Sequence, residues 1–207
     1  MMRRLVLAVA LICLFSSAAV AQEPLPDALE LYRQGNYSRA VEVTLQEIEA
    51  QPRRVDSYVV LGWSLLALFR NEEALNYAED GLLVSRTDQR LLNIAAEAAH
   101  ALDRTDVALG HLETYVALWP EGAYIADTFA LIGSILAEYG EYRNAETAYM
   151  AALHHREEGE WWRELGAVRE ELEELPRAVN AYEAAIAINP GDEGAQESLA
   201  RIEANVP

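Results

Sequence analysis

Residues 162–190 read WRELGAVREELEELPRAVNAYEAAIAINP, and their spacing is the strongest structural signal in the chain. Gly166 is followed twelve residues later by Ala178, and Pro190 comes twelve residues after that. Four earlier pairs of small residues have the same spacing: Ala28 and Ala40, Gly62 and Ala74, Ala96 and Ala108, and Gly133 and Ala145. The first members of the five pairs are 34, 34, 37 and 33 residues apart, which predicts an array of helical repeats.

The residues around these pairs resemble the tetratricopeptide repeat, whose pattern is W-x2-L-G-x2-Y, then A-x3-F, then A and P. The last copy matches best, through Trp162, Leu165, Gly166, Ala178, Tyr182, Ala185 and Pro190. The third copy is weaker because Ala95 and Ala96 replace the Leu-Gly pair, and the first is weakest because Pro24 replaces the aromatic residue. The resemblance covers residues 24–192 and implies pairs of antiparallel helices.

We therefore expect an all-α fold, a right-handed superhelical solenoid of five helix-turn-helix repeats with a C-terminal capping helix. Residues 22–192 hold the repeats, with expected ranges of 22–54, 55–88, 89–122, 126–158 and 159–192. Residues 193–207 form the capping helix and a tail, with Leu199 and Ile202 on the apolar side of that helix.

Local signals place the ends of the helices. Gly35 and Gly140 supply the turns within two repeats, and Pro52, Pro120 and Pro190 stop three of the second helices. Three extra residues, 123–125, lengthen the turn before the fourth repeat. In the second repeat the small side chains of Gly62 and Ala74 are expected where the two helices cross.

Residues 1–21 have the pattern of a secretory signal peptide. Arg3 and Arg4 precede the apolar run 5–15, and the sequence ends in Ala19-Val20-Ala21, which predicts cleavage after Ala21 and a periplasmic or secreted protein. Retention of the segment as an anchor is the alternative. Ile12 before Cys13 argues against a lipoprotein, and the processed chain would contain no cysteine and therefore no disulfide.

The charge of the chain excludes several classes of partner. Acidic residues number 34 and basic residues 16, all of them arginine, giving a net charge of −18. Such a chain repels phosphate backbones and anionic lipid, so we expect neither nucleic-acid binding nor direct membrane insertion after the leader is removed. The expected partners are proteins or peptides of the cell envelope, with a homo-oligomer as a further possibility.

The sequence carries no catalytic motif. It lacks a G-x-S-x-G elbow, a P-loop, a dinucleotide fingerprint and H-E-x-x-H, so the expectation is a protein that is not an enzyme and has no cofactor. His154 and His155 are adjacent and would point to different sides of a helix, which disfavours a shared metal ion. No metal site is predicted.

The family resemblance implies a concave groove that is lined by the first helix of each repeat and receives a peptide or a partner's helix. Positions one after, three before and four after the small crossing residue would face it. The candidate contacts selected from these positions are Val59, Trp63, Leu66, Asn93, Glu97, His100, Ser134 and Arg163. Family members that bind chaperone tails hold a carboxylate with lysines. This chain has none, and only Asn93, Arg90 and Arg163 could substitute.

Trp63 is the most testable of these positions, because an indole offers a large contact area at a binding site. The alternative is that Trp63 packs across to the first repeat. The expected function is an adaptor that helps to assemble or position an envelope complex, such as outer-membrane, cell-wall, secretion or periplasmic motor machinery. A self-associating structural subunit and an acidic regulator of a periplasmic enzyme are the alternatives.

Overall fold

The structure is a computed structural model that describes residues 25–205, and the predicted leader with its cleavage site at Ala21 falls outside that range. The described chain forms eleven α-helices and no β-strand. They are α1 (Ala28–Arg33), α2 (Tyr37–Ala50), α3 (Val55–Ala67), α4 (Asn71–Val84), α5 (Gln89–His100), α6 (Thr105–Leu118), α7 (Ile125–Glu138), α8 (Tyr142–His155), α9 (Gly159–Glu171), α10 (Leu175–Ile188) and α11 (Glu193–Asn205).

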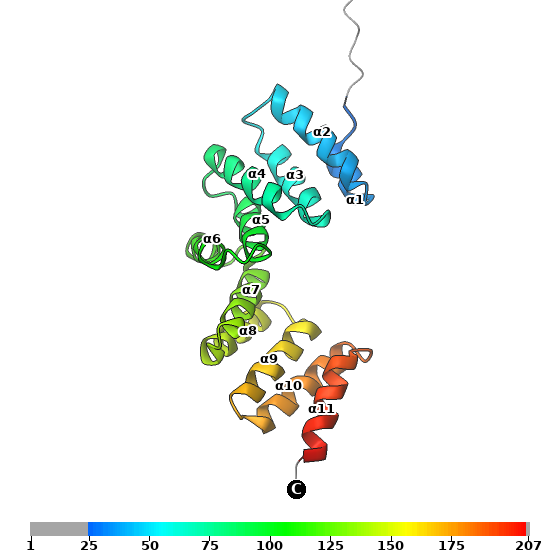
Figure 1. Ribbon diagram of the computed structural model, residues 1–207, viewed down its shortest axis with the longest axis vertical. Coiled ribbons are helices and arrows are strands. Elements are labelled where there is room, and N and C mark those ends of the chain that lie inside the picture. Colours follow the sequence, from blue (N-terminus) through cyan, green and yellow to red (C-terminus); the bar gives the residue numbers. More distant parts are fainter. Residues whose placement is uncertain (1–24, 206–207) are drawn as a thin grey trace, which may run out of the picture.

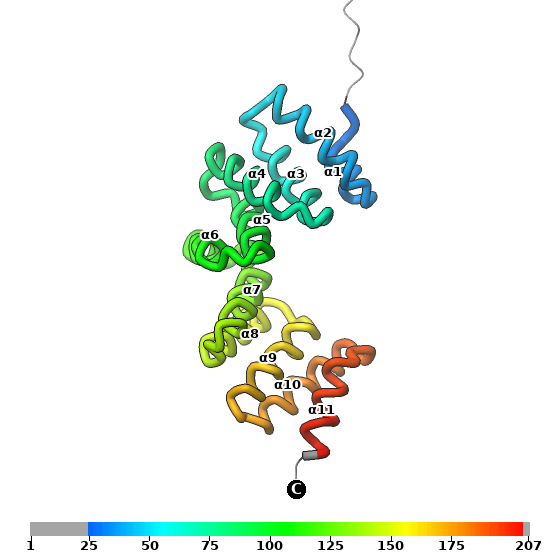
Figure 2. Tube along the Cα trace, in the orientation of Figure 1, coloured from blue at the N-terminus to red at the C-terminus, as the bar shows by residue number. Residues whose placement is uncertain are grey.

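The helices stack along one axis, from α1 at one end to α11 at the other (Figure 1). Each odd-numbered helix packs against the even-numbered helix that follows it, and each pair packs on the next pair. The tube in Figure 2 shows that the chain winds from pair to pair without returning to an earlier one. The expected solenoid of five repeats with a capping helix is confirmed. Among the described helices, none is both long enough and apolar enough to cross a lipid bilayer.

The turn inside every repeat has the same backbone geometry. One residue adopts a left-handed conformation in each turn, namely Gly35, Phe69, Asp103, Gly140 and Glu173, with φ between 56° and 75°. In the fourth repeat Gly140 N–H donates to the Ala137 carbonyl at 3.0 Å and Glu141 N–H donates to the Leu136 carbonyl at 2.8 Å. This pair of bonds is the Schellman motif, and it satisfies carbonyls that the end of a helix leaves open. The predicted glycine turns are confirmed, and three further repeats use residues with side chains.

Small residues allow close packing both within a repeat and between neighbouring repeats. A Cβ on Gly166 would lie 2.7 Å from the ring of Tyr182, so the tyrosine of α10 packs directly on the backbone of α9. A Cβ on Gly62 would lie 2.8 Å from Ile94, which belongs to the next repeat. The β-branched side chain of Ile94 therefore packs directly on the backbone of α3 at Gly62.

The apolar core is divided into separate clusters near the junction of the third and fourth repeats. One cluster of buried side chains centres on the second and third repeats, and another joins the fourth and fifth. The turn between α6 and α7 has six residues, 119–124, whereas the other turns between repeats have three or four. The buried Tyr115 holds this turn, because its hydroxyl accepts from Tyr124 N–H at 2.8 Å and donates to Gln89 Oε1 at 3.1 Å. The turn thus has its own polar support.

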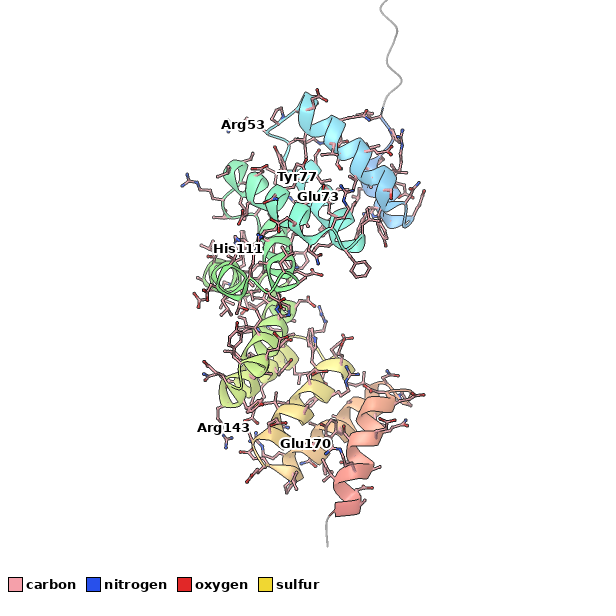
Figure 3. The ribbon with its side chains drawn as sticks, viewed as in Figure 1. Arg53, Glu73, Tyr77, His111, Arg143 and Glu170 are labelled. Carbon is pink, nitrogen blue, oxygen red and sulfur yellow. The ribbon has the colours of Figure 1, made fainter. Side chains whose placement is uncertain are left out.

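Ion pairs join neighbouring elements along the stack, and Figure 3 labels Arg143 and Glu170, which take part in two of them. Glu170 of α9 accepts from Arg201 of the capping helix at 2.7 Å, which ties α11 to the last repeat. Arg169 and Glu146 form the most buried pair, with Nε and Oε1 3.0 Å apart between α9 and α8. Exposed pairs such as Arg143 with Glu174 are screened by solvent and add little, so apolar packing dominates the stability.

Candidate functional site

The first helices of the repeats form one continuous wall of the solenoid. Contacts join α1 to α3, α3 to α5, α5 to α7, and α7 to α9, so the odd-numbered helices lie side by side. We call this surface the inner wall. Two hollows open along it, and between them they contain five of the eight residues that the sequence singled out.

The first hollow, called here the N-terminal hollow, lies mainly between α1 and α3 and has a volume of about 600 Å³. Val59 and Trp63 both line it. The indole of Trp63 is half-buried, and its ring centroid lies 5.7 Å from that of Tyr32 in the first repeat. Trp63 therefore packs across to the first repeat and also borders the hollow, and its role as a contact stays a prediction. Charges of both signs surround it, including the pair of Arg90 with Asp56.

The second hollow, called here the central hollow, has a volume of about 800 Å³ and spans the junction between the third and fourth repeats. Three predicted residues line it: Asn93 and Glu97 from α5, and Ser134 from α7. Its lining also holds the carboxylates of Asp127, Glu160 and Glu164 and the aromatic rings of Tyr124, Tyr149 and Trp161. Within the described chain, no basic side chain belongs to this lining.

The other three predicted residues have different surroundings. Leu66 is half-buried and packs against the core of the second and third repeats. His100 Nε2 lies 3.7 Å from a carboxylate oxygen of Glu138. Arg163 donates to Asp192 and Glu164, at 3.1 and 3.2 Å. None of the three lines either hollow, because core packing and ion pairs already use their side chains.

The central hollow has a negative electrostatic character. Partial burial, and then the charge of Asp127, raise the pKa of Glu97 above its usual value. Burial, followed by the charge of Glu164, raises the pKa of Tyr149 to about 12, so its phenol is neutral at physiological pH. Both shifts come first from burial and then from a neighbouring carboxylate, although Asp127 is paired with Arg156 and Glu164 with Arg163.

The side chain of Arg156 lies beside this hollow and contacts two residues of its lining. The guanidinium carbon of Arg156, from the turn between α8 and α9, lies 4.6 Å from the ring centroid of Trp161. The same side chain donates two hydrogen bonds to Asp127. Stacking on an indole together with a carboxylate fork is the arrangement that stabilises a guanidinium ion.

The residues that the sequence rule missed lie one helical turn from those it found. Asp127 and Glu160 are six residues before the small crossing positions Gly133 and Gly166, and Glu164 is two residues before Gly166. An inner-wall position recurs every three or four residues along a helix. Extending the rule by one turn toward the helix N-terminus also selects Asp127 and Glu160.

The geometry does not favour a clamp for a terminal carboxylate. Arg90 bonds Asp88 and Asp56, and Arg163 bonds Asp192, so both cations are neutralised within the fold. Residues 25–205 hold no group of three or more histidine or acidic side chains arranged for a metal ion. His155 stacks on Phe129 with ring centroids 6.0 Å apart.

Comparisons with known proteins agree with this architecture. Among solved structures, the chain is similar to MamA, with a TM-score of 0.69, 18% identity, and coverage of 86% of this chain and 99% of that one. It is also similar to TTC0263, a thermophilic TPR protein of Thermus thermophilus, with a TM-score of 0.65, 20% identity and coverage of 86% and 95%. It is similar as well to YrrB, described as a TPR protein with an unusual peptide-binding site, with a TM-score of 0.67, 19% identity, and coverage of 83% of this chain and 87% of that one.

These likenesses concern the fold, since the identities are low. At the level of sequence, no curated protein matches the chain. The tetratricopeptide-repeat profile matches residues 25–89 and 131–193, which together make up more than half of the chain. The repeated spacing, the five identical turns and this match lead to one conclusion: the chain belongs to the tetratricopeptide repeat family.

Proposed function

We propose that this chain is an extracytoplasmic scaffold that binds a segment of a partner protein on its inner wall and helps to assemble or position a cell-envelope complex. The leader pattern of residues 1–21 supports the location. Membership of a family whose proteins bind peptide or protein partners supports the mode of action.

The observation that carries the proposal is the pair of hollows on the inner wall. Successive first helices build both of them, and their lining mixes aromatic rings with hydrogen-bonding groups such as Asn93 and Ser134. A groove with these properties suits an extended or helical peptide, since apolar rings supply contact area and polar groups fix the register. No catalytic role is included in the proposal.

A site-specific crosslinking experiment in intact cells tests the binding role. A photo-reactive residue replaces Ser134 in the central hollow, and a matched control carries it at Glu183, an exposed position on α10. We expect a discrete protein adduct from position 134 that is absent from position 183. The same adducts from both positions, or none from position 134, would contradict an inner-wall contact.

The location needs a separate measurement. Mass spectrometry of the protein recovered from extracytoplasmic fractions should find a chain that begins at Gln22. A chain that retains its first residues and stays in the cytosolic fraction would refute export, and it would leave the crosslinking result intact.

Self-association is the second candidate. Helix α1 has six residues, whereas the other four first helices have twelve to fourteen, and Leu25 and Leu45 are exposed near that end. A thinly covered repeat end can stack on another solenoid. Light scattering at high protein concentration decides this point, because a strict monomer excludes it.

A further inference from the structure

We propose that the central hollow binds an arginine-containing basic segment of a partner polypeptide, with one guanidinium group held among its carboxylates and aromatic rings. The proposal rests on the scaffold function above and specifies the chemistry of the partner at this position. Three features of the hollow carry it: its charge, its aromatic rings and the behaviour of Arg156.

The carboxylates come from three repeats and face a common space. Glu97 lies on α5, Asp127 on α7, and Glu160 and Glu164 on α9. Among the ion pairs of residues 25–205 around this hollow none involves Glu97, and the charge of Asp127 opposes its ionisation. Asp127 is paired with Arg156, and Glu160 and Glu164 are paired with Arg163 at 3.5 and 3.2 Å, so the fold already places guanidinium groups against three of the four carboxylates. Glu97 is the carboxylate that a cation of the ligand would pair.

The aromatic side chains select among cations. Tyr124, Tyr149 and Trp161 line the hollow, and the faces of aromatic rings attract a guanidinium more often than an ammonium group. Arginine also has a planar fork that matches a carboxylate, whereas lysine is a strongly hydrated point charge. A ligand arginine should therefore bind better here than a ligand lysine.

Arg156 already makes the contact that we assign to the ligand. Its guanidinium stacks on Trp161, with the guanidinium carbon 4.6 Å from the ring centroid, and it bonds Asp127. Both of those residues line the hollow. Arg156 is about half exposed and sits in a turn between helices, so its side chain can be displaced by a ligand arginine.

The N-terminal hollow offers a contrast. It is also lined by acidic groups, but Arg33, Arg54 and Arg90 stand among them, and Arg54 pairs with Glu47 at 3.2 Å. The charges of its lining are therefore balanced. In the central hollow the pairing arginines, Arg156 and Arg163, are not part of the lining, and Glu97 lies beside several aromatic rings without an ion pair among the described residues.

The binding test uses the purified processed protein and a fluorescein-labelled synthetic peptide of alternating arginine and alanine. Fluorescence anisotropy is recorded at physiological salt, where exposed charges are screened beyond about 8 Å. The pocket variant carries Glu97→Gln and Glu164→Gln. The control variant carries Glu113→Gln and Glu183→Gln, which removes the same charge from exposed positions on second helices α6 and α10.

The pocket variant should weaken peptide binding by about tenfold, which corresponds to about 1.4 kcal/mol, and the control variant by less than about twofold. The lysine version of the peptide should bind more weakly than the arginine version. Equal losses in the two variants would overturn the proposal, because they would show a diffuse attraction to an acidic surface. Equal binding of a peptide of alternating glutamate and alanine would overturn it as well.

Arg156 provides an independent check. Replacing it by alanine should strengthen peptide binding by about threefold, since an intramolecular competitor for the cation–π contact with Trp161 is removed. Arg86→Ala removes the same charge from an exposed position and should have little effect. Equal effects of the two substitutions would contradict a shared site. A Ser134 crosslink to a partner without basic segments would refute the inference and leave the scaffold function standing.

Discussion

Phe69 should destabilise the repeat in which it stands, so that replacing it by glycine makes the protein more stable. The residue closes the turn between α3 and α4 with φ of 56°, in the left-handed region. The equivalent residues of the first and fourth repeats are Gly35 and Gly140, with φ of 75° and 74°. The Phe69 side chain is 88% exposed, so it gains almost nothing from packing.

The expected magnitude follows from the backbone. A left-handed conformation costs a residue with a Cβ roughly 1–2 kcal/mol, and glycine avoids this cost. Glycine also has more conformational freedom in the unfolded chain, and this lowers the stability of the folded protein by about 0.5–1 kcal/mol. Phe69→Gly should therefore raise the free energy of unfolding by about 0.5–1 kcal/mol, or shift Tm upward by about 2 °C in a chain of this size.

Urea unfolding followed by circular dichroism at 222 nm measures the change. The mirror control is Gly140→Ala, where an added Cβ would meet no atom within 4 Å, so that the substitution isolates the backbone conformation. It should lower the free energy of unfolding by about 0.5–1.5 kcal/mol. A loss of stability in Phe69→Gly, with the expected loss in Gly140→Ala, would show that the phenylalanine ring makes a stabilising contact and would refute the reasoning.

Three further outcomes test other parts of the fold. Thr128 has the buried side-chain oxygen that lacks a hydrogen-bond partner within the described residues, so Thr128→Val should raise the free energy of unfolding by about 1 kcal/mol in urea titrations. Tyr115→Phe removes the acceptor of a main-chain N–H in the turn before α7 and should lower it by about 1–3 kcal/mol, with faster hydrogen exchange across residues 119–124. Hydrogen bonds from Arg201 lower the pKa of Glu170 in the folded protein. The stabilisation that the ionised carboxylate provides is therefore complete above the ordinary glutamate pKa of about 4.3, and it is lost as the pH falls through the lower pKa of the folded state. The difference in unfolding free energy between wild type and Glu170→Gln should vanish over that pH range.

Most of the fold could be predicted because repeat architecture depends on short-range signals. Each helix pair contacts only its neighbours, so residues a few turns apart determine the packing. The prolines at 52, 120 and 190 each stand two residues after the end of a second helix, as expected. The apolar side of the capping helix was also identified correctly, since Ile202 is buried and Leu199 packs beside it.

What the sequence did not reveal depends on contacts between repeats. Asp103 and Glu173 adopt left-handed conformations without any glycine signal, because the packing of the helices on both sides fixes the turn. The space left by Gly62 is filled by Ile94, thirty-two residues later, which a rule confined to one repeat cannot find. Tertiary packing overrides local preference at such positions.

The candidate site was partly predicted for a related reason. Spacing places a residue on the inner wall, and three of the residues it selected, Asn93, Glu97 and Ser134, line one hollow. Spacing cannot show which inner-wall side chains form ion pairs within the fold. For this reason the candidates included His100, which lies near Glu138, and Arg163, which pairs with Asp192. The hydrogen-bond geometry supplied that distinction.

The family pattern is weakest where the central hollow lies. The profile matches residues 25–89 and 131–193, and the segment between the two matches contains α5, the long turn and the start of α7. Glu97 and Asp127, which oppose each other electrostatically across the junction, both come from this segment. Departures from a structural pattern tend to occur where function requires them, so the weakest part of the repeat signal is where a partner contact is best sought.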